Sequence, residues 1–182
     1  TWRFNDQWSL TLGLRGSHET VEYGYFAAPG NGSSLGFLLS ARGEPACGAP
    51  PCTNLLFPAT AGRLSDSGSF NSWVGRAVLG YKVGDNINTY ASVSRGRRPN
   101  MINVSDLGSD EVEAEIVWSY ELGMKGSAGD GRFVYDLSLF YYDYNNFQAS
   151  AQNDTPPPFF ITKNAGKAHA QGFEASLFGR FS

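Results

Sequence analysis

The sequence predicts an all-β fold, an antiparallel up-and-down meander that forms part of a transmembrane β-barrel. Apolar and polar residues alternate over several segments of roughly ten residues, which is typical of strands with one lipid-facing and one water-facing side. Short turns and long connections also follow one another strictly along the chain. Aromatic residues make up 14% of the 182 residues, glycine occurs 22 times and charged residues make up only 17%. This composition fits a β-protein with many turns.

The clearest hairpin lies between residues 116 and 144, with turn residues at 127–131. Every second residue of its first strand is apolar: Ile116, Trp118, Tyr120, Leu122 and Met124. The residues between them are a mixture of charged, hydroxyl and small residues. Because side chains of a strand point alternately to opposite faces, each parity covers one face of the predicted sheet. We expect the apolar face to contact lipid and the polar face to line a hydrated interior.

The same alternation predicts the other strands of the meander. Residues 1–4 are expected to end an earlier strand, and further strands are expected at about 8–22, 70–82, 87–95 and 173–181. In the strand at 87–95, one face holds Ile87, Ala91 and Val93 and the other holds Asn88, Ser92 and Ser94.

The lengths of the connections place the strand ends. Short turns are expected at 5–7, 83–86 and 127–131, and long loops at about 23–69, 96–115 and 149–158. Short and long connections alternate, so all short turns lie at one end of the sheet and all long loops at the other. This asymmetry is the layout of outer-membrane barrels, and a soluble β-sandwich does not require it.

Charge and hydropathy exclude other classes of protein. No run of 18 apolar residues occurs, so no transmembrane helix is predicted. The formal net charge of -3 argues against a nucleic-acid partner, because binding to phosphates requires a basic surface. The chain begins and ends within sequence that resembles strands, and we therefore expect it to be a fragment.

Four segments carry a resemblance to a known family. They are Tyr90–Asn100 (YASVSRGRRPN), Ser119–Gly126 (SYELGMKG), Leu137–Gln148 (LSLFYYDYNNFQ) and Asn164–Glu174 (NAGKAHAQGFE). In composition, order and spacing they resemble segments of TonB-dependent outer-membrane receptors. The resemblance covers about residues 70–182 well, and residues 1–69 only through the leading strand.

The resemblance implies a 22-stranded barrel, closed by an N-terminal plug domain, in the outer membrane of a Gram-negative bacterium. Such receptors import a scarce nutrient with energy from the TonB complex, and a ferric siderophore is the favoured ligand. Residues 1–182 would then be one partial barrel domain without its plug, in contact with outer-membrane lipid. Six strands cannot enclose a lumen of that size, because the diameter grows with the number of strands.

Three arginines are candidate ligand-binding residues. Arg95, Arg97 and Arg98 occur where a strand enters a long loop, and the guanidinium fork suits anionic ligands. The alternatives are a solvated rim or contacts between these arginines and lipid phosphates.

The longest loop contains the two cysteines of the chain, Cys47 and Cys52. In an oxidising compartment we expect a disulfide that braces this loop, with a stabilisation of roughly 2 kcal/mol. No metal site or cofactor is predicted, because His18 and His169 stand on different strands. The acidic residues of the 96–115 loop lack EF-hand spacing and are expected to be solvated: Asp106, Asp110, Glu111, Glu113 and Glu115.

The remaining charges and aromatic rings fit the barrel. The charged residues on polar parities are expected to face the lumen: Glu121, Lys125, Asp136, Glu174 and Arg180. Aromatic girdles at the headgroup level are expected from Trp73, Trp118, Tyr81, Tyr135 and Tyr141. An enzyme is not predicted, because nothing sets a nucleophile beside a carboxylate pair. Two alternatives stay open, a small structural or adhesive outer-membrane barrel and a soluble carbohydrate-binding β-sandwich.

Overall fold

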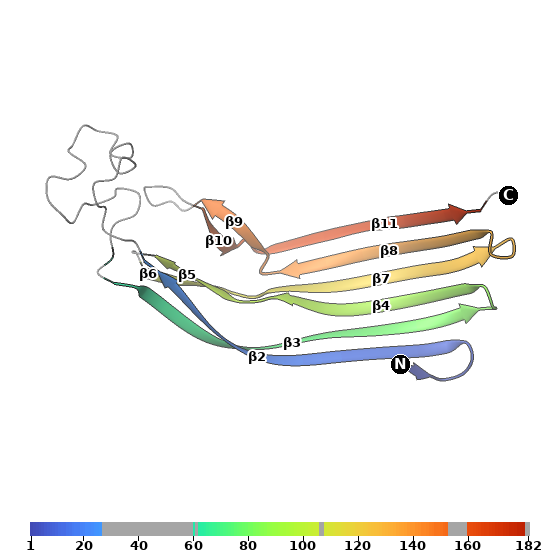
Figure 1. The fold of residues 1–182 in the computed structure, drawn as a ribbon, viewed down its shortest axis with the longest axis horizontal. Helices are drawn as coiled ribbons and strands as arrows, with labels where there is room; N and C mark the ends of the chain where they lie inside the picture. The colour runs from blue at the N-terminus through green and yellow to red at the C-terminus, as the bar shows by residue number, and fades with distance from the viewer. Residues whose placement is uncertain (27–59, 61, 106–107, 153–159, 181–182) are drawn as a thin grey trace, which may run out of the picture.

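A single antiparallel sheet dominates the computed structural model, which describes residues 1–26, 60, 62–105, 108–152 and 160–180. Its seven strands follow the order β1-β2-β3-β4-β7-β8-β11 (Figure 1). Their bounds are β1 Trp2–Arg3, β2 Trp8–Tyr25, β3 Leu64–Val83, β4 Ile87–Arg98, β7 Glu115–Ala128, β8 Phe133–Asn145 and β11 Lys167–Gly179. Each strand pairs with its neighbours in the meander, so the predicted all-β, up-and-down architecture is confirmed. Among the described residues no helix is long and apolar enough to cross a membrane.

Two small hairpins interrupt the meander at the end opposite the tight turns (Figure 1). The first pairs β5 (Met101–Ser105) with β6 (Gly108–Val112), and the second pairs β9 (Gln148–Gln152) with β10 (Phe160–Asn164). The first hairpin lies within the stretch expected to be the long loop 96–115. The second extends past both ends of the expected loop 149–158, because β9 begins at Gln148 and β10 ends at Asn164.

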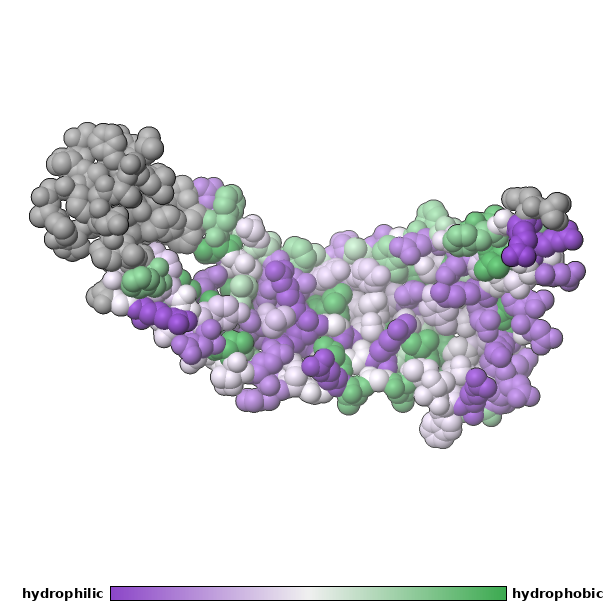
Figure 2. All heavy atoms as spheres, in the orientation of Figure 1, coloured by the Kyte–Doolittle hydropathy of each residue, from purple (hydrophilic) through white to green (hydrophobic). Residues whose placement is uncertain are grey.

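The three short turns lie together at the other end of the sheet (Figure 1), where hydrophilic residues gather (Figure 2). In the first turn Asn5 Oδ1 accepts the backbone N–H groups of Gln7 and Trp8, at 2.9 and 2.8 Å. This is the local hydrogen bonding for which asparagine is favoured in turns. In the second turn Gly84 has a φ of 67°, which glycine adopts without steric cost.

The strands are longer than the sequence pattern indicates. β2 and β3 stay paired up to Tyr25 and Leu64, so both ends of the expected 23–69 loop are strand. β4 likewise continues to Arg98. Beyond the lipid-facing part of these strands, towards the long loops, we expect both faces to meet water. The hydrophobic alternation therefore stops there, although the backbone ladder continues. Cys47 and Cys52, for which a disulfide was expected, lie outside the described residues.

The register aligns the two parities across the whole sheet. One row pairs Leu10 with Leu79, Leu79 with Ala91, Ala91 with Leu122, Leu122 with Leu139, and Leu139 with Phe173. Rows above and below it are also largely apolar, and these side chains are strongly exposed; Leu14 is 80% and Phe173 is 76% exposed. An exposed, continuous apolar face is a binding surface, and on a barrel strand its partner is lipid.

Three aromatic rings lie over glycines directly opposite them in the ladder. Tyr90 pairs with Gly123, Tyr135 with Gly126, and Phe140 with Gly172. A Cβ atom added at any of these glycines would lie less than 3 Å from the ring of its partner. The missing side chain therefore gives each ring its place against the neighbouring strand.

Candidate functional site

Aromatic rings mark both edges of the apolar face. At the end with the short turns, the rings of Trp8 and Tyr81 pack at an interplanar angle of 40°, with 4.5 Å between their centroids. At the opposite edge, Trp73 and Trp118 meet edge to face at 6.0 Å. Amphipathic rings of this kind occupy the interface between acyl chains and headgroups.

The height of the apolar face matches a membrane. On β4 the lowest apolar residue is Ile87 and the first charged residue is Arg95, eight positions further on. A rise of about 3.3 Å per residue gives about 26 Å along the strand, and a tilt of about 40° leaves a height of about 20 Å. The apolar band of a transmembrane barrel is about 25 Å tall, so this face spans most of a bilayer core.

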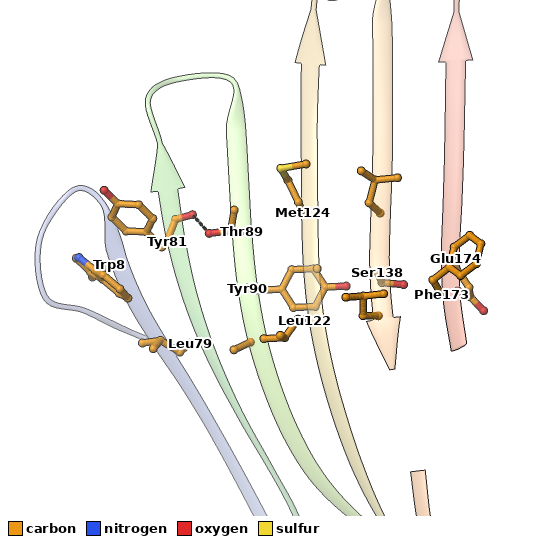
Figure 3. A pocket seen from close by; sticks show the side chains of 14 residues that line it. Trp8, Leu79, Tyr81, Thr89, Tyr90, Leu122, Met124, Ser138, Phe173 and Glu174 are labelled. Carbon is orange, nitrogen blue, oxygen red and sulfur yellow. Dashed lines mark hydrogen bonds between the residues drawn. The ribbon is translucent and has the colours of Figure 1, made fainter. Parts of the chain in front are cut away.

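An open hollow of about 700 Å³ lies on the apolar face, bordered by Leu79, Leu122, Met124 and Phe173 (Figure 3). The hydroxyl of Thr89 also borders it, and this hydroxyl donates a 3.1 Å hydrogen bond to the backbone carbonyl of Tyr81. With its polar group satisfied, the lining suits an acyl chain better than a polar nutrient.

The polar face carries paired charges. Lys125 Nζ lies 2.7 Å from Asp136 Oδ2 and directly opposite it in the ladder. Glu121 accepts a hydrogen bond from the hydroxyl of Tyr90. Glu174 lies in register with Ser138 on the same face. The remaining predicted lumen residue, Arg180, follows β11 directly and its backbone N–H donates to Arg132 O at 2.9 Å.

The structure separates the three predicted ligand-binding arginines. Arg95 shares the apolar parity of β4, and its guanidinium lies 4.2 Å from the ring centroid of Trp73. The side chain of Arg97 is 6% exposed and donates hydrogen bonds to Glu19 Oε2 at 2.9 Å and to Asn100 Oδ1 at 2.8 Å. Arg98 is exposed and makes a long hydrogen bond of 3.4 Å to the Gln148 carbonyl. Of the three, Arg98 is the most exposed.

Gln148 joins the strand ends at the mouth from a buried position, with 4% exposure. Its Nε2 donates to the carbonyls of Pro99 and Glu113, at 3.0 and 2.9 Å. Its backbone N–H donates to Glu115 Oε2 at 2.7 Å. These bonds connect segments 49, 35 and 33 residues apart in the chain.

Asn164 extends this network to the end of β10. Its Oδ1 accepts the N–H of Glu113, and its Nδ2 donates to the carbonyls of Glu113 and Asn146, each at 2.9 Å. The amide side chain of Asn164 thus binds both the N–H and the carbonyl of Glu113, as the backbone of a neighbouring strand would. In the same region Asn103 Nδ2 donates to Thr162 O at 2.8 Å, which ties β5 to β10. The two hairpins therefore form one hydrogen-bonded unit.

The β5–β6 hairpin also rests on β3. A Cβ atom at Gly68 would lie 3.5 Å from Ile102 Cδ1, and Ile102 is only 6% exposed. Nearby, Ser109 donates a hydrogen bond to the Asp66 carboxylate. This bond, with a smaller contribution from the Ser67 amide, lowers the pKa of Asp66 below its ordinary value. The polar contact and the apolar contact together fix the hairpin above the sheet.

The family of the chain follows from its full-length match. The family model described as TonB dependent receptor-like, beta-barrel, matches residues 1–182. The chain belongs to the TonB-dependent receptors. Members of this family are outer-membrane proteins of Gram-negative bacteria, and the family comprises receptors and transporters rather than enzymes. The resemblance, the fold class and the location predicted from the sequence are confirmed, and the soluble sandwich is not.

Individual relatives agree with this assignment. The ferric-pyoverdine receptor of Pseudomonas sp. (strain M114) is 34% identical over 101 residues, which cover 54% of this chain and 12% of the relative. The ferric yersiniabactin uptake receptor of Yersinia pestis has a TM-score of 0.66 at 22% identity, over 100% of this chain and 23% of that one. A ferric-catecholate import receptor of E. coli K12 has a TM-score of 0.59 at 22% identity, over 99% and 24%. This receptor chain thus spans about an eighth to a quarter of these proteins.

Both histidines of this receptor chain lie on the parity of its apolar face. His18 Nδ1 is 2.9 Å from Asn71 Oδ1, and the ring of His169 stacks on Tyr141 with 6.4 Å between centroids. Within the described ranges no three His, Cys, Asp or Glu side chains converge as metal ligands.

The residues that sequence reasoning missed are the amides of the mouth, Gln148 and Asn164. Gln148 is the last residue of one segment that resembles the family, and Asn164 is the first residue of another. Their positions in these segments are the signal in the sequence that could have identified them. Their partners are Pro99, Glu113, Glu115 and Asn146, which lie where the long strands join the two hairpins that the sequence did not predict.

Proposed function

We propose that this chain forms part of the barrel wall of a receptor that imports a ferric siderophore across the outer membrane, with energy from the TonB complex. The observation that carries the proposal is the match over the whole chain to the receptor family. The curated relative that is 34% identical is a ferric-pyoverdine receptor, which favours ferric siderophores as the class of ligand. In this proposal a 22-stranded barrel and a plug complete the transporter.

The mouth supplies a rigid rim for ligand contacts. The hydrogen-bonded unit of the two hairpins holds backbone positions that would otherwise move independently, and rigid sites bind with a smaller entropic cost. We place the ligand contacts in the regions expected to be long loops, 23–69, 96–115 and 149–158. At this rim the exposed guanidinium of Arg98 would contact an anionic ferric chelate.

Uptake in cells tests the proposal. The gene is deleted from its host and restored on a plasmid, and cells are offered radioiron as ferric pyoverdine, a ferric catecholate or haem. We expect deletion to abolish uptake of one ferric siderophore, restoration to recover it, and a protonophore to block it. Unchanged uptake of all three probes, with normal growth under iron limitation, would refute import and favour a structural barrel.

Arg98 is tested in the same strain. Arg98→Gln should weaken binding of the transported siderophore about tenfold, the loss of one charged hydrogen bond of about 1.5 kcal/mol. Arg132→Gln, in the turn at the opposite end, is the matched control and should bind normally. Equal affinity of both variants and the wild type would remove Arg98 from the site but leave the import function intact.

A further inference from the structure

Arg95 lies where the apolar face ends on the side of the mouth. In the ladder it is directly opposite Gly75 and Trp118. Two positions below it on the same face is Val93, and the next position of β3 above Trp73 on this face is Asn71. The charged group therefore stands at the level where headgroups meet acyl chains.

The guanidinium is held in place by Trp73. Its Cζ atom lies 4.2 Å from the ring centroid of Trp73, and Nη1 donates to the backbone carbonyl of the same residue. The ladder between β3 and β4 ends at the pair Gly75 and Arg95, so this carbonyl lies beyond that ladder and the arginine covers it. Trp118, which is directly opposite Arg95 in the ladder, packs edge to face against Trp73. The arrangement is preorganised by contacts that the protein makes without a ligand.

Most of the donors of Arg95 remain available. A guanidinium has five N–H groups, and one of them is used by the Trp73 carbonyl. The two ion pairs found among the described residues involve other side chains, Arg97 and Lys125. Asp143 lies in the same row of the sheet as Arg95, but Trp118 of β7 pairs with both residues and separates them. A half-buried cation at a lipid boundary is costly unless an anion accompanies it.

We propose that Arg95, Trp73 and Trp118 form a binding site for the phosphate of an outer-leaflet lipid headgroup. The free edge of the guanidinium binds two phosphate oxygens at once, and the indole rings pack against the adjoining sugar and acyl carbons. The leaflet on the side of the mouth is rich in phosphorylated lipid A, which supplies this chemistry. The site faces away from the lumen, so it is independent of the imported cargo.

The test measures binding of phosphorylated lipid A to the complete receptor in dodecyl maltoside micelles. The wild type is titrated with lipid A, with lipid A stripped of its phosphates, and with inorganic phosphate, and the shift in thermal unfolding is recorded. Arg95→Gln removes the charge, Arg95→Lys keeps the charge without the fork, and Arg132→Gln is the control at the other membrane edge. Heat-modifiable mobility on gels verifies that each variant is folded.

We expect stabilisation by phosphorylated lipid A alone. The half-saturating concentration should rise about tenfold in Arg95→Gln, as expected for one lost charged hydrogen bond, and less in Arg95→Lys. Arg132→Gln should match the wild type. Equal responses to the intact and stripped lipids would overturn the proposal even if no variant folds. An equal response to inorganic phosphate, or an unaltered Arg95→Gln, would overturn it as well.

Discussion

Two variants of β4, each with one new arginine at the same depth but on opposite faces, can show which face meets lipid. The quantity compared is their free energy of unfolding. Ala91 and Ser92 are adjacent, so their side chains point to opposite faces at the same depth. Ala91 lies in the row of Leu79 and Leu122, and Ser92 lies opposite Glu121. Ala91→Arg would therefore put a cation among acyl chains, and Ser92→Arg would put it beside a carboxylate in the lumen.

The expected cost follows from the depth of Ala91. It lies four residues from Ile87 and four from Arg95, or about 13 Å along the strand in each direction. With a tilt of about 40° this is about 10 Å of height to either edge, which places Ala91 near the midplane. An arginine on the lipid face at the midplane costs about 2–4 kcal/mol. Ser92→Arg should cost less than about 1 kcal/mol, because the lumen is hydrated and Glu121 is near.

Guanidinium titration of the complete receptor in phospholipid vesicles, followed by tryptophan fluorescence, gives the two free energies of unfolding. The difference between the variants is the informative quantity, since each has gained the same side chain. If Ser92→Arg proved as destabilising as Ala91→Arg, or more so, the assignment of the two faces would be refuted.

Three further predictions concern the polar contacts. Asn164→Ala removes three exposed hydrogen bonds and should lower the local unfolding free energy of the hairpins by about 1–2 kcal/mol, seen as faster amide hydrogen exchange. A double-mutant cycle on Lys125 and Asp136 should give a coupling of about 0.2–1 kcal/mol that falls with added salt, because both side chains are exposed. The hydrogen bond from Ser109 lowers the pKa of Asp66 in the folded protein, so this contact stabilises the fold fully above the ordinary carboxyl pKa and is lost as the pH falls through the lowered pKa of the folded state. Ser109→Ala should move the Asp66 titration, followed by carboxyl NMR, towards higher pH.

Each of these has an outcome that contradicts it. Unchanged exchange in Asn164→Ala would mean that the hairpins are held by other contacts. A coupling above about 2 kcal/mol would show that the lysine and aspartate are desolvated in the assembled barrel. A titration of Asp66 that ignores the serine would leave the backbone amide as the dominant cause.

The meander and its faces were predictable from the sequence because lipid selects one parity. From Leu10 to Leu14 and from Trp118 to Met124 the alternation is continuous, and the ladder found in the structure follows it. Above the membrane this selection disappears, so the end of β2 and the start of β3 were invisible although their backbones pair. The same loss of pattern concealed both hairpins.

The parity of the sequence already places Arg95 on the apolar face. This face of β4 holds Ile87, Ala91 and Val93, and two further positions along the strand reach Arg95. The cationic cluster with Arg97 and Arg98 suggested one shared site at the loop. Parity separates these residues more reliably than their proximity in the chain, since one step along a strand changes the face.

The glycines that lie beneath Tyr90, Tyr135 and Phe140 act as alignment marks between neighbouring strands. If either partner slipped by one residue, the ring would turn to the opposite side and meet a Cβ atom in place of the gap. Three such marks span the joints β4–β7, β7–β8 and β8–β11. A strand that pairs one residue out of register therefore meets a steric clash at each of these three joints.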